Sequence, residues 1–236
     1  MNETFLIDYF AKNGFNLNET QVSQFLRYYG LLIEWNEKMN LTAITDFEEV
    51  VEKHFVDSLL GSRFMPYLSG RKIIDVGTGA GFPGIPLKIV YPDVQVLLLD
   101  SLQKRIGFLD AVISELGLTG ISAVHGRAEE LSRKPEYREK YDICVSRAVA
   151  RLSSLCELCL PFVKVNGMFL AYKSQKAEEE VKEAENAIKL LSGGNTLLSK
   201  ITLGDDMNRS FIQIKKIAPT SDKYPRGGGK PLKQPL

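Results

Sequence analysis

The stretch IIDVGTGAGFPGI, residues 73–85, decides the fold, because an apolar run stops at an acid and a glycine-rich turn follows at once. A residue without Cβ permits both a tight turn and a close approach of the backbone to a ligand. Gly79, Gly81 and Gly84 satisfy the dinucleotide pattern G-x-G-x-x-G. Asp75 with the glycines at 77, 79 and 81 satisfies D-x-G-x-G-x-G, the turn that follows the first strand in enzymes using S-adenosylmethionine (SAM). The motif alone therefore predicts a ligand-binding turn and leaves two cofactors open.

The surroundings of the turn favour one of the two fold families. From Lys72 onward, β-rich runs alternate with helical lengths, which is typical of βαβ units and a largely parallel sheet. The strands expected in this part are 72–76, 94–99, 121–125, 141–146 and 167–172. Two further runs, 197–203 and 209–216, are joined only by the turn GDDMN, which predicts an antiparallel hairpin. We therefore expect an α/β fold, the Rossmann-like seven-stranded sheet of a class I SAM-dependent methyltransferase.

Helical patterns precede the sheet. Asn18 is a plausible cap for a helix whose apolar positions recur at spacings of three and four, and a second helical pattern runs over 46–60. These patterns predict an N-terminal helical subdomain at 1–66. The SAM-dependent methyltransferase domain then occupies 67–218, and a basic C-terminal tail occupies 219–236.

The composition sets limits on the function. The 236 residues are 44% hydrophobic and 25% charged, which is ordinary for a globular protein. The net charge of +1 means that any nucleic-acid surface must be a local patch. The N-terminal residues lack the basic and apolar regions of a secretion signal, and no segment has the length that spans a bilayer. We therefore expect a cytoplasmic protein that does not bind membranes.

The three cysteines and two histidines do not suggest a metal site. Cys156 and Cys159 form a C-x-x-C within a helical pattern, and Cys144 lies in an expected strand. Four ligands are hard to assemble from this set, so we expect free thiols and no metal.

Acidic and basic residues at strand ends are the candidate cofactor ligands, because ligands lie beyond the carboxyl ends of the strands in a doubly wound sheet. Asp100 ends the second strand, where an acid accepts hydrogen bonds from ribose hydroxyls in SAM or NAD. Asp75 favours SAM, which is cationic at sulfur. Ala128 and Glu129 follow the third strand, where an adenine would lie. Arg147 follows the fourth strand and could meet a cofactor carboxylate or an RNA phosphate, or form a surface salt bridge.

The sequence also narrows the atom that is methylated. No Asn-Pro-Pro-aromatic tetrapeptide follows the fourth strand, which disfavours an exocyclic amine as the target. Cys144 has apolar neighbours and does not suit a nucleophile. A substrate atom that already has a free lone pair remains.

The chain resembles the RsmG (formerly GidB) family of 16S rRNA guanine-N7 methyltransferases, from its N-terminal helices to its last residue. The motifs that carry the resemblance are W-N-x-x-x-N-L-T-x-I at 35–44, H-x-x-D-S-L at 54–59, DVGTGAGFPGIPL at 75–87, DSLQKRIGFL at 100–109, RAEE at 127–130, SRAVARL at 146–152, LPFVKVNG at 160–167 and YPRGGGKPLKQPL at 224–236. Together these motifs are highly specific.

The resemblance implies SAM as cofactor and a guanosine in the 530 loop of 16S rRNA as substrate. It implies cofactor contacts at Gly77, Phe82, Asp100, Ser101, Leu102, Ala128, Glu129 and Arg147, to which the turn adds Asp75 and Gly79. The expected partner is 16S rRNA in the small ribosomal subunit or an assembly intermediate. The protein is expected to be a monomer.

The expected chemistry needs no catalytic acid or base. Guanine N7 carries a lone pair and no proton, so methyl transfer requires only alignment. His54, Asp57 and Ser58 lie within five positions of one helix and cannot converge as a triad, so a structural or site-shaping role is expected for them.

Basic residues of the tail are candidate RNA ligands. The tail lacks the apolar periodicity of a helix or strand and has more cations than acids, which predicts a flexible basic arm that binds phosphates. The candidates are Lys223, Arg226, Lys230 and Lys233 in the tail, with Arg127, Arg151, Lys173 and Arg209 elsewhere. The alternatives are a tail without a role, an NAD-dependent oxidoreductase, and a non-catalytic RNA-binding module.

Overall fold

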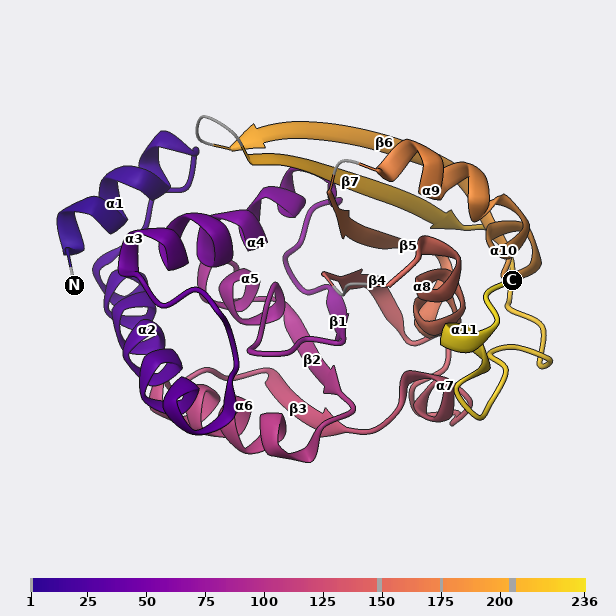
Figure 1. Cartoon of the computed structure of the whole chain (residues 1–236), viewed down its shortest axis with the longest axis horizontal. Coiled ribbons are helices and arrows are strands. Elements are labelled where there is room, and N and C mark those ends of the chain that lie inside the picture. Colours follow the sequence, from indigo (N-terminus) through magenta and orange to yellow (C-terminus); the bar gives the residue numbers. More distant parts are fainter. Residues whose placement is uncertain (1, 148–149, 175, 204–206) are drawn as a thin grey trace.

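The computed structural model, which describes residues 2–147, 150–174, 176–203 and 207–236, is built around one seven-stranded sheet. The strand order is β3-β2-β1-β4-β5-β7-β6 (Figure 1). The strands are β1 (Lys72–Val76), β2 (Gln95–Asp100), β3 (Ile121–His125), β4 (Tyr141–Ser146), β5 (Val163–Lys173), β6 (Gly193–Leu203) and β7 (Met207–Lys216). The predicted α/β fold is confirmed, although residues 204–206 of the predicted turn lie outside the described residues.

The direction of the strands places the site. β1 pairs in parallel with β2 on one side and β4 on the other, whereas β7 runs antiparallel to both β5 and β6. The chain order therefore reverses between β1 and β4, and in such sheets the crevice at the reversal binds the ligand. The glycine turn follows β1 at this point.

Two strands begin well before their predicted starts. β5 begins at Val163 and β6 at Gly193, each four residues before the predicted start. Asn166 has a φ of 70°, and the register between β4 and β5 shifts nearby, so the backbone of β5 is irregular in this part. A Cβ on Gly167 would lie 2.6 Å from the Asp142 carbonyl, so the close approach of β4 requires glycine in the strand.

The N-terminal helices form as expected, with one addition. The cap at Asn18 is confirmed: its side chain accepts from the Gln21 backbone at 2.9 Å, and the Gln21 side chain accepts from the Asn18 backbone at 3.0 Å. This capping box starts α2 (Glu19–Met39), and the unpredicted α1 (Glu3–Lys12) precedes it. The second pattern forms α3 (Phe47–Val50), a π-helical turn η1 (Val51–Val56) and α4 (Asp57–Leu60), and the 3₁₀ turn η2 (Gly61–Phe64) follows.

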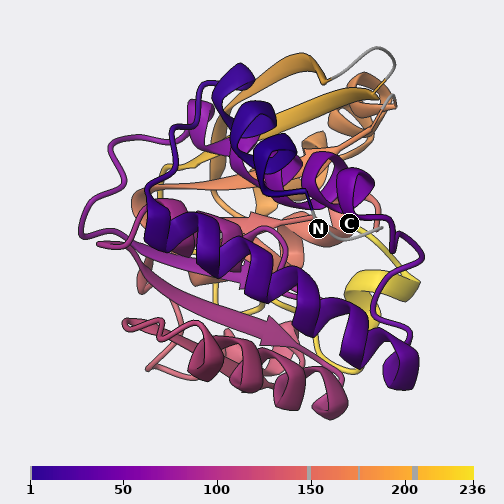
Figure 2. The same cartoon turned by 90° about the vertical axis from the view of Figure 1, so that its left-hand side faces the viewer.

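Helices cover both faces of the sheet, and each face has its own apolar core. The N-terminal helices share one core with α5 (Gly84–Val90) and α6 (Gln103–Glu115). The opposite core contains α7 (Ala128–Leu131), α8 (Leu152–Cys159), α9 (Ala177–Glu183) and α10 (Glu185–Leu190), and the 3₁₀ turn η3 (Leu160–Phe162) follows α8. Figure 2 shows the indigo N-terminal helices lying across one face of the sheet. The N-terminal helices therefore pack directly on the sheet that carries the site. The predicted boundary between a helical subdomain and the methyltransferase domain at residue 66 stays a prediction.

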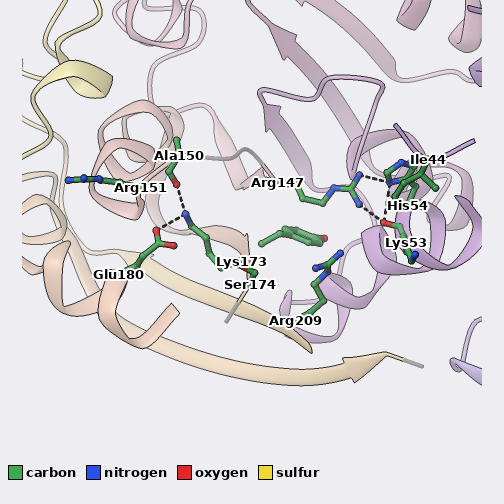
Figure 3. Close-up of a pocket in the computed structure, with 11 residues that line it drawn as sticks. Ile44, Lys53, His54, Arg147, Ala150, Arg151, Lys173, Ser174, Glu180 and Arg209 are labelled. Atoms are coloured by element: carbon green, nitrogen blue, oxygen red, sulfur yellow. Dashed lines mark hydrogen bonds and ion pairs between the residues drawn. The ribbon is translucent and has the colours of Figure 1, made fainter. Parts of the chain in front are cut away.

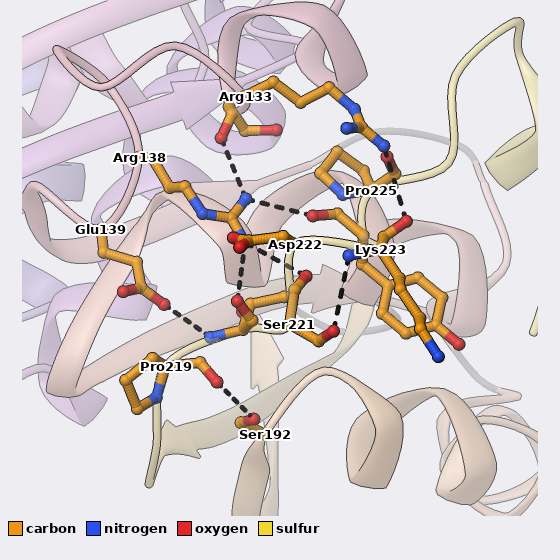
Figure 4. Close-up of polar contacts among 12 residues, drawn as sticks. Arg133, Arg138, Glu139, Ser192, Pro219, Ser221, Asp222, Lys223 and Pro225 are labelled. Atoms are coloured by element: carbon orange, nitrogen blue, oxygen red, sulfur yellow. Dashed lines mark hydrogen bonds and ion pairs between the residues drawn. The ribbon is translucent and has the colours of Figure 1, made fainter.

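The C-terminal tail is bound to the body of the protein, and the expectation of a flexible arm is wrong. Arg138 donates to the carbonyls of Thr220 at 2.7 Å and Tyr224 at 3.1 Å, and Arg133 donates to that of Pro225 (Figure 4). The tail ends in the short helix α11 (Lys230–Lys233). Its anchors are side-chain bonds to backbone carbonyls, which apolar periodicity does not reveal.

Cysteine chemistry agrees with the expectation, because Cys144, Cys156 and Cys159 are free thiols and all are buried. Within the described ranges, no group of three or more His, Cys, Asp or Glu side chains could hold a metal ion. In the same ranges, no helix is both long enough and apolar enough to cross a bilayer.

Candidate active site

The glycine turn after β1 forms the floor of a pocket. Gly77, Gly79 and Gly81 have φ angles of 74°, 61° and 96°, a region that side chains rarely adopt. A Cβ on Gly81 would lie 2.7 Å from the Tyr28 hydroxyl, so packing also requires glycine there. A Cβ on Gly79 would meet nothing within 4 Å, because this residue faces open space. The turn is thus packed on one side and open to a ligand on the other.

Asp75 supports the turn from below. Its Oδ2 accepts hydrogen bonds from the Thr78 hydroxyl at 2.7 Å and the Gly84 backbone at 2.8 Å. Burial raises the pKa of this carboxyl to about 7, against the opposing effect of those two bonds. The side chain is completely buried and does not line the pocket. The predicted contact with a cofactor is therefore corrected: Asp75 shapes the turn, because Thr78 and Gly84 curl over it.

The pocket above the turn, here called the turn pocket, has a volume of about 430 Å³. It brings together six of the predicted residues: Gly77, Gly79, Phe82, Asp100, Ser101 and Arg147. It also contains Leu41, Thr42 and Arg105, which sequence reasoning missed as ligands. Leu41 and Thr42 belong to the W-N-x-x-x-N-L-T-x-I motif, and this motif could have indicated that they lie at the site. Leu102 lies beside the pocket and is 43% exposed.

Asp100 is held in one orientation at the end of β2. Its Oδ2 accepts from the Gly79 backbone at 2.9 Å, and its Oδ1 accepts from the Leu102 backbone at 2.9 Å. Arg105 forms an ion pair with the same carboxylate at 3.0 Å. An open glycine turn beside an oriented carboxylate is the donor and acceptor set that fits the ribose and backbone contacts of an adenosine cofactor.

Ala128 and Glu129 lie further from the turn. Both are nearly buried at the start of α7, and Glu129 accepts from Arg127 Nε at 2.9 Å. Neither lines the turn pocket as the structure shows it. Their loop follows β3, whose last residue His125 pairs in register with Asp100. The contact with an adenine therefore stays a prediction.

A second, larger pocket of about 660 Å³ adjoins the first and is strongly cationic, and we call it the basic pocket (Figure 3). Its lining includes five cationic side chains, Lys53, Arg147, Arg151, Lys173 and Arg209. Glu180 is the one acidic side chain among the described residues that line it. His54 and Arg147 line both pockets, so they form the wall between them.

Not all of these cations are free to bind a ligand. Lys173 is nearly buried and forms an ion pair with Glu180 at 2.6 Å, and it also donates to the Ala150 carbonyl. Figure 3 shows its side chain directed toward these two residues and away from Arg147. The prediction that Lys173 binds RNA is corrected for this reason, since its ammonium is already paired. Arg151, at the N-terminus of α8, and Arg209, on β7, remain candidates.

The predicted RNA ligands of the tail lie outside both pockets. Lys223, Lys230 and Lys233 are exposed, whereas Arg226 is bound to Glu157 of α8 at 2.7 Å. Nε and Nη2 of Arg226 both bind that fully buried carboxylate, and Nη2 also binds the Gln234 carbonyl. Its guanidinium is therefore committed to the fold, and the prediction that it binds RNA is corrected. Gly229 lies beside Arg127, where a Cβ would be 3.2 Å from Nη2. The tail therefore runs past the loop that follows β3.

The wall between the pockets is built on a buried carboxylate. Asp57 accepts from Arg147 Nη1 at 2.8 Å and from Arg209 Nε at 2.5 Å. The Arg147 guanidinium lies 5.0 Å from the centre of the Phe82 ring, and the His54 ring stacks on the same ring at 4.7 Å. Burial, with Arg147 adding to it, lowers the pKa of His54 to about 4, so this imidazole is neutral near pH 7.

His54, Asp57 and Ser58 are not arranged as a triad. Ser58 donates its hydroxyl to the His54 carbonyl at 2.5 Å, and Asp57 binds arginines. The sequence did not predict that Asp57 would contact Arg147 and Arg209.

The strand order, the antiparallel hairpin and the glycine turn beside an acidic strand end define a class I methyltransferase. Solved structures agree on the fold. A chain from the complex between the Haloferax volcanii Trm112 methyltransferase activator and its methyltransferase matches with a TM-score of 0.59 at 13% identity, over 79% of this chain and 98% of that chain. M. jannaschii TYW2, solved with AdoMet, matches with a TM-score of 0.52 at 13% identity, over 68% of this chain and 77% of that one.

The chain belongs to the GidB family, rRNA small subunit methyltransferase G, whose model matches residues 21–208. A curated relative from Lachnoclostridium phytofermentans, named ribosomal RNA small subunit methyltransferase G, is 58% identical over 226 residues. That alignment covers 94% of this chain and 93% of the relative. The resemblance first seen in the motifs is confirmed.

Proposed function

We propose that this protein transfers the methyl group of SAM to N7 of a guanosine in the 530 loop of 16S rRNA. The observation that carries the proposal is the pair of adjoining pockets with a common wall at His54 and Arg147. One pocket suits an adenosine cofactor and the other suits a nucleotide of a polyanion. Membership of the rRNA small subunit methyltransferase G family supports the same substrate.

The turn pocket is the proposed SAM site. Asp100 accepts from the ribose hydroxyls, and the open face of Gly79 lets the backbone approach the ligand. Further contacts are proposed at Gly77, Phe82, Ser101, Leu102, Ala128, Glu129 and Arg147. SAM supplies an electrophilic methyl group on a cationic sulfur. The protein contributes the position of that group relative to the basic pocket.

The geometry is consistent with methyl transfer that needs no proton acceptor. Guanine N7 attacks through a lone pair that bears no proton, so the rate enhancement comes from holding N7 in line with the methyl carbon and the sulfur of SAM. His54 is neutral near pH 7 and is stacked on Phe82, which suits a wall that orients a base. Arg147 lies over the same ring and adds positive charge on the basic side of that wall.

Phosphate binding is assigned to the cations that the fold leaves available. Arg151 and Arg209 line the basic pocket, and Lys223, Lys230 and Lys233 extend the surface along the tail. Arg127 lies beside Gly229 of the tail. We propose that the protein acts as a monomer in the cytoplasm, on the small ribosomal subunit or an assembly intermediate of it.

The product identifies the reaction. Small-subunit rRNA from cells lacking the protein is incubated with the purified enzyme and SAM, then treated with borohydride and aniline, which cleave at 7-methylguanosine. We expect one new cleavage site, in the 530 loop, and no cleavage with the Asp100→Ala variant. Methyl groups found only on adenine or cytosine contradict the proposal.

Calorimetry separates the proposal from its alternatives. An NAD-dependent oxidoreductase would bind NADH in place of SAM, and a non-catalytic RNA-binding module would bind RNA without forming a product. We expect heat of binding with SAM and none with NADH.

A further inference from the structure

A single carboxylate links three distant segments at the boundary between the pockets. Asp57 follows the π-helical turn η1, Arg147 follows β4, and Arg209 lies on β7. Both arginines donate to Asp57, one to each oxygen, at 2.8 and 2.5 Å. The Asp57 side chain has no exposed surface, whereas those of Arg147 and Arg209 are 19% and 26% exposed. The carboxylate is therefore enclosed, and the two guanidiniums face the pockets.

Stability alone does not account for this arrangement. Desolvating a carboxylate offsets much of the attraction it gains, and well-packed apolar residues often replace such a group without loss of stability. A carboxylate between two guanidiniums does something that apolar residues cannot do. It fixes the orientation of both planar groups, because each donates along a defined direction to one oxygen.

The orientation decides which donors face the basic pocket. Arg209 uses Nε for Asp57, and its terminal Nη groups have no hydrogen-bond partner in the part of the chain that the structure describes. Arg147 uses Nη1 for Asp57 and the Lys53 carbonyl, and its plane lies over Phe82 in the turn pocket. One arginine therefore keeps a free pair of donors, and the other is held against the cofactor side.

We propose that Asp57 is a positioning residue, which holds Arg209 to bind a phosphate of the target nucleotide and holds Arg147 as the surface that sets the target base against the turn pocket. This inference rests on the proposed methylation of rRNA. Asp57 itself is enclosed and touches neither substrate nor cofactor. Its effect is the alignment of the base, so its loss affects kcat more than the binding of RNA.

Two variants test the inference. Asp57→Asn keeps the shape and removes the charge, so one guanidinium faces an amide donor and loses its fixed direction. We expect kcat on small-subunit rRNA to fall about tenfold or more, since small misplacements of reacting groups have large effects on rate. RNA affinity is expected to stay equal or become tighter, because a negative charge behind the wall of the pocket is removed. Arg209→Lys retains the cation and removes the fork, so the same fall in kcat is expected with nearly unchanged RNA affinity.

The double variant distinguishes positioning from independent damage. If Asp57 acts partly through Arg209, the fall in kcat for Asp57→Asn combined with Arg209→Lys is smaller than the product of the two single falls. Asp142→Asn is the matched control, because Asp142 also accepts from two cations, Arg71 at 3.0 Å and Lys164 at 2.6 Å, at the opposite edge of the sheet. It should lower the melting temperature and leave kcat unchanged.

The outcomes separate the inference from the proposed function. A folded Asp57→Asn enzyme with wild-type kcat overturns the role of Asp57, and so do effects that simply multiply. Wild-type enzyme is assayed in the same series. If it methylates no guanosine, the proposed function fails, and a fully active wild type beside an equally active Asp57→Asn variant contradicts only the inference.

Discussion

Gly79 shows how a residue without a side chain can determine a binding site. Its φ of 61° and the open space around its missing Cβ leave the backbone free to meet a ligand, and its N–H orients Asp100 at 2.9 Å. Gly117, at the end of α6, has nearly the same conformation, with a φ of 60° and nothing within 4 Å of a Cβ. The two glycines share a conformation, but Gly79 lines the turn pocket and Gly117 follows the end of a helix.

Replacing each of these glycines by valine tests the pocket. Both Gly79→Val and Gly117→Val should lose roughly 1–2 kcal/mol of stability, since each forces a branched residue into the left-handed region. Only Gly79→Val should weaken SAM binding, by about tenfold or more, which is about 1.4 kcal/mol. Calorimetric titration measures both affinities. Equal SAM affinities in the two folded variants would mean that the turn pocket does not bind the cofactor.

Asp75 gives the folded protein a pH dependence with an unusual sign. Its pKa is raised from 3.8 to about 7, so the folded state holds a proton that the unfolded chain has released. The unfolding free energy from this group is therefore largest below about pH 4 and falls as the pH rises to about 7. His54 acts in the opposite sense, because its lowered pKa makes stability rise between about pH 4 and 6.5.

Asp75→Asn isolates the first of these two effects. The amide cannot ionise and can still accept from Thr78 and Gly84. We expect the variant to gain stability relative to wild type as the pH rises from about 4 to 7, by at most about 1.4 kcal/mol per pH unit. Urea unfolding across that range measures the difference, in which the His54 contribution cancels. A difference that is constant with pH would show that Asp75 does not bury a proton.

The element that departs furthest from its sequence pattern is the tail. Glu157 lies fully buried on α8 and accepts from Arg226 through the backbone N–H at 2.6 Å, Nε at 3.0 Å and Nη2 at 2.7 Å. Arg226 also donates to the Gln234 carbonyl at 2.8 Å, which ties α11 to the same point. This buried ion pair therefore adds to the bonds from Arg133 and Arg138 that hold the earlier part of the tail.

Arg226→Ala should therefore destabilise the whole protein. It leaves the Glu157 carboxylate buried without a partner, which costs roughly 3–5 kcal/mol. Lys233→Ala is the matched control, since it removes an exposed cation from the same tail and should change stability by less than about 0.5 kcal/mol. Urea unfolding gives both values, and limited proteolysis should cut the tail faster only in Arg226→Ala. Similar values for the two variants would refute the anchoring role of the ion pair.

Across the whole molecule, the small net charge conceals an uneven distribution. The basic pocket lies at the carboxyl ends of the strands, and the tail passes Arg127 at the same edge. Deleting the tail would also remove the partner of Glu157, so substitution is the cleaner test of RNA binding. Three exposed lysines, Lys223, Lys230 and Lys233, can be replaced without breaking that ion pair.

The triple lysine-to-alanine variant of the tail should weaken RNA binding through charge. The slope of log affinity against log salt should flatten by roughly 0.7 for each single-stranded phosphate that the variant no longer neutralises, with SAM affinity unchanged. Alanine at Lys72, Lys140 and Lys215, which are exposed at the opposite edge, is the control with the same change in charge. Affinities across a salt series check the expectation. Identical slopes for the two triple variants would exclude the tail from RNA binding.

The sequence by itself determined the sheet, its terminal hairpin and most of the turn pocket. These features depend on contiguous signals: a glycine turn directly after a strand, the alternation of β-rich runs with helical lengths, and an acid at the end of β2. Residues such as Gly77, Gly79 and Asp100 therefore reached their predicted places. The positions of these residues depend on local backbone geometry, which is set by residues that are neighbours in the sequence.

Only the tertiary structure decided which charges meet. Asp57 binds Arg147 and Arg209 across 90 and 152 residues, and Glu157 binds Arg226 across 69. Every cation in the sequence looks equally able to bind RNA until its partner is known, and buried carboxylates take some of them out of that role. The physical reason is that pairing of buried charges depends on which side chains folding brings together. Residues so far apart in the sequence show no local pattern that predicts their contact.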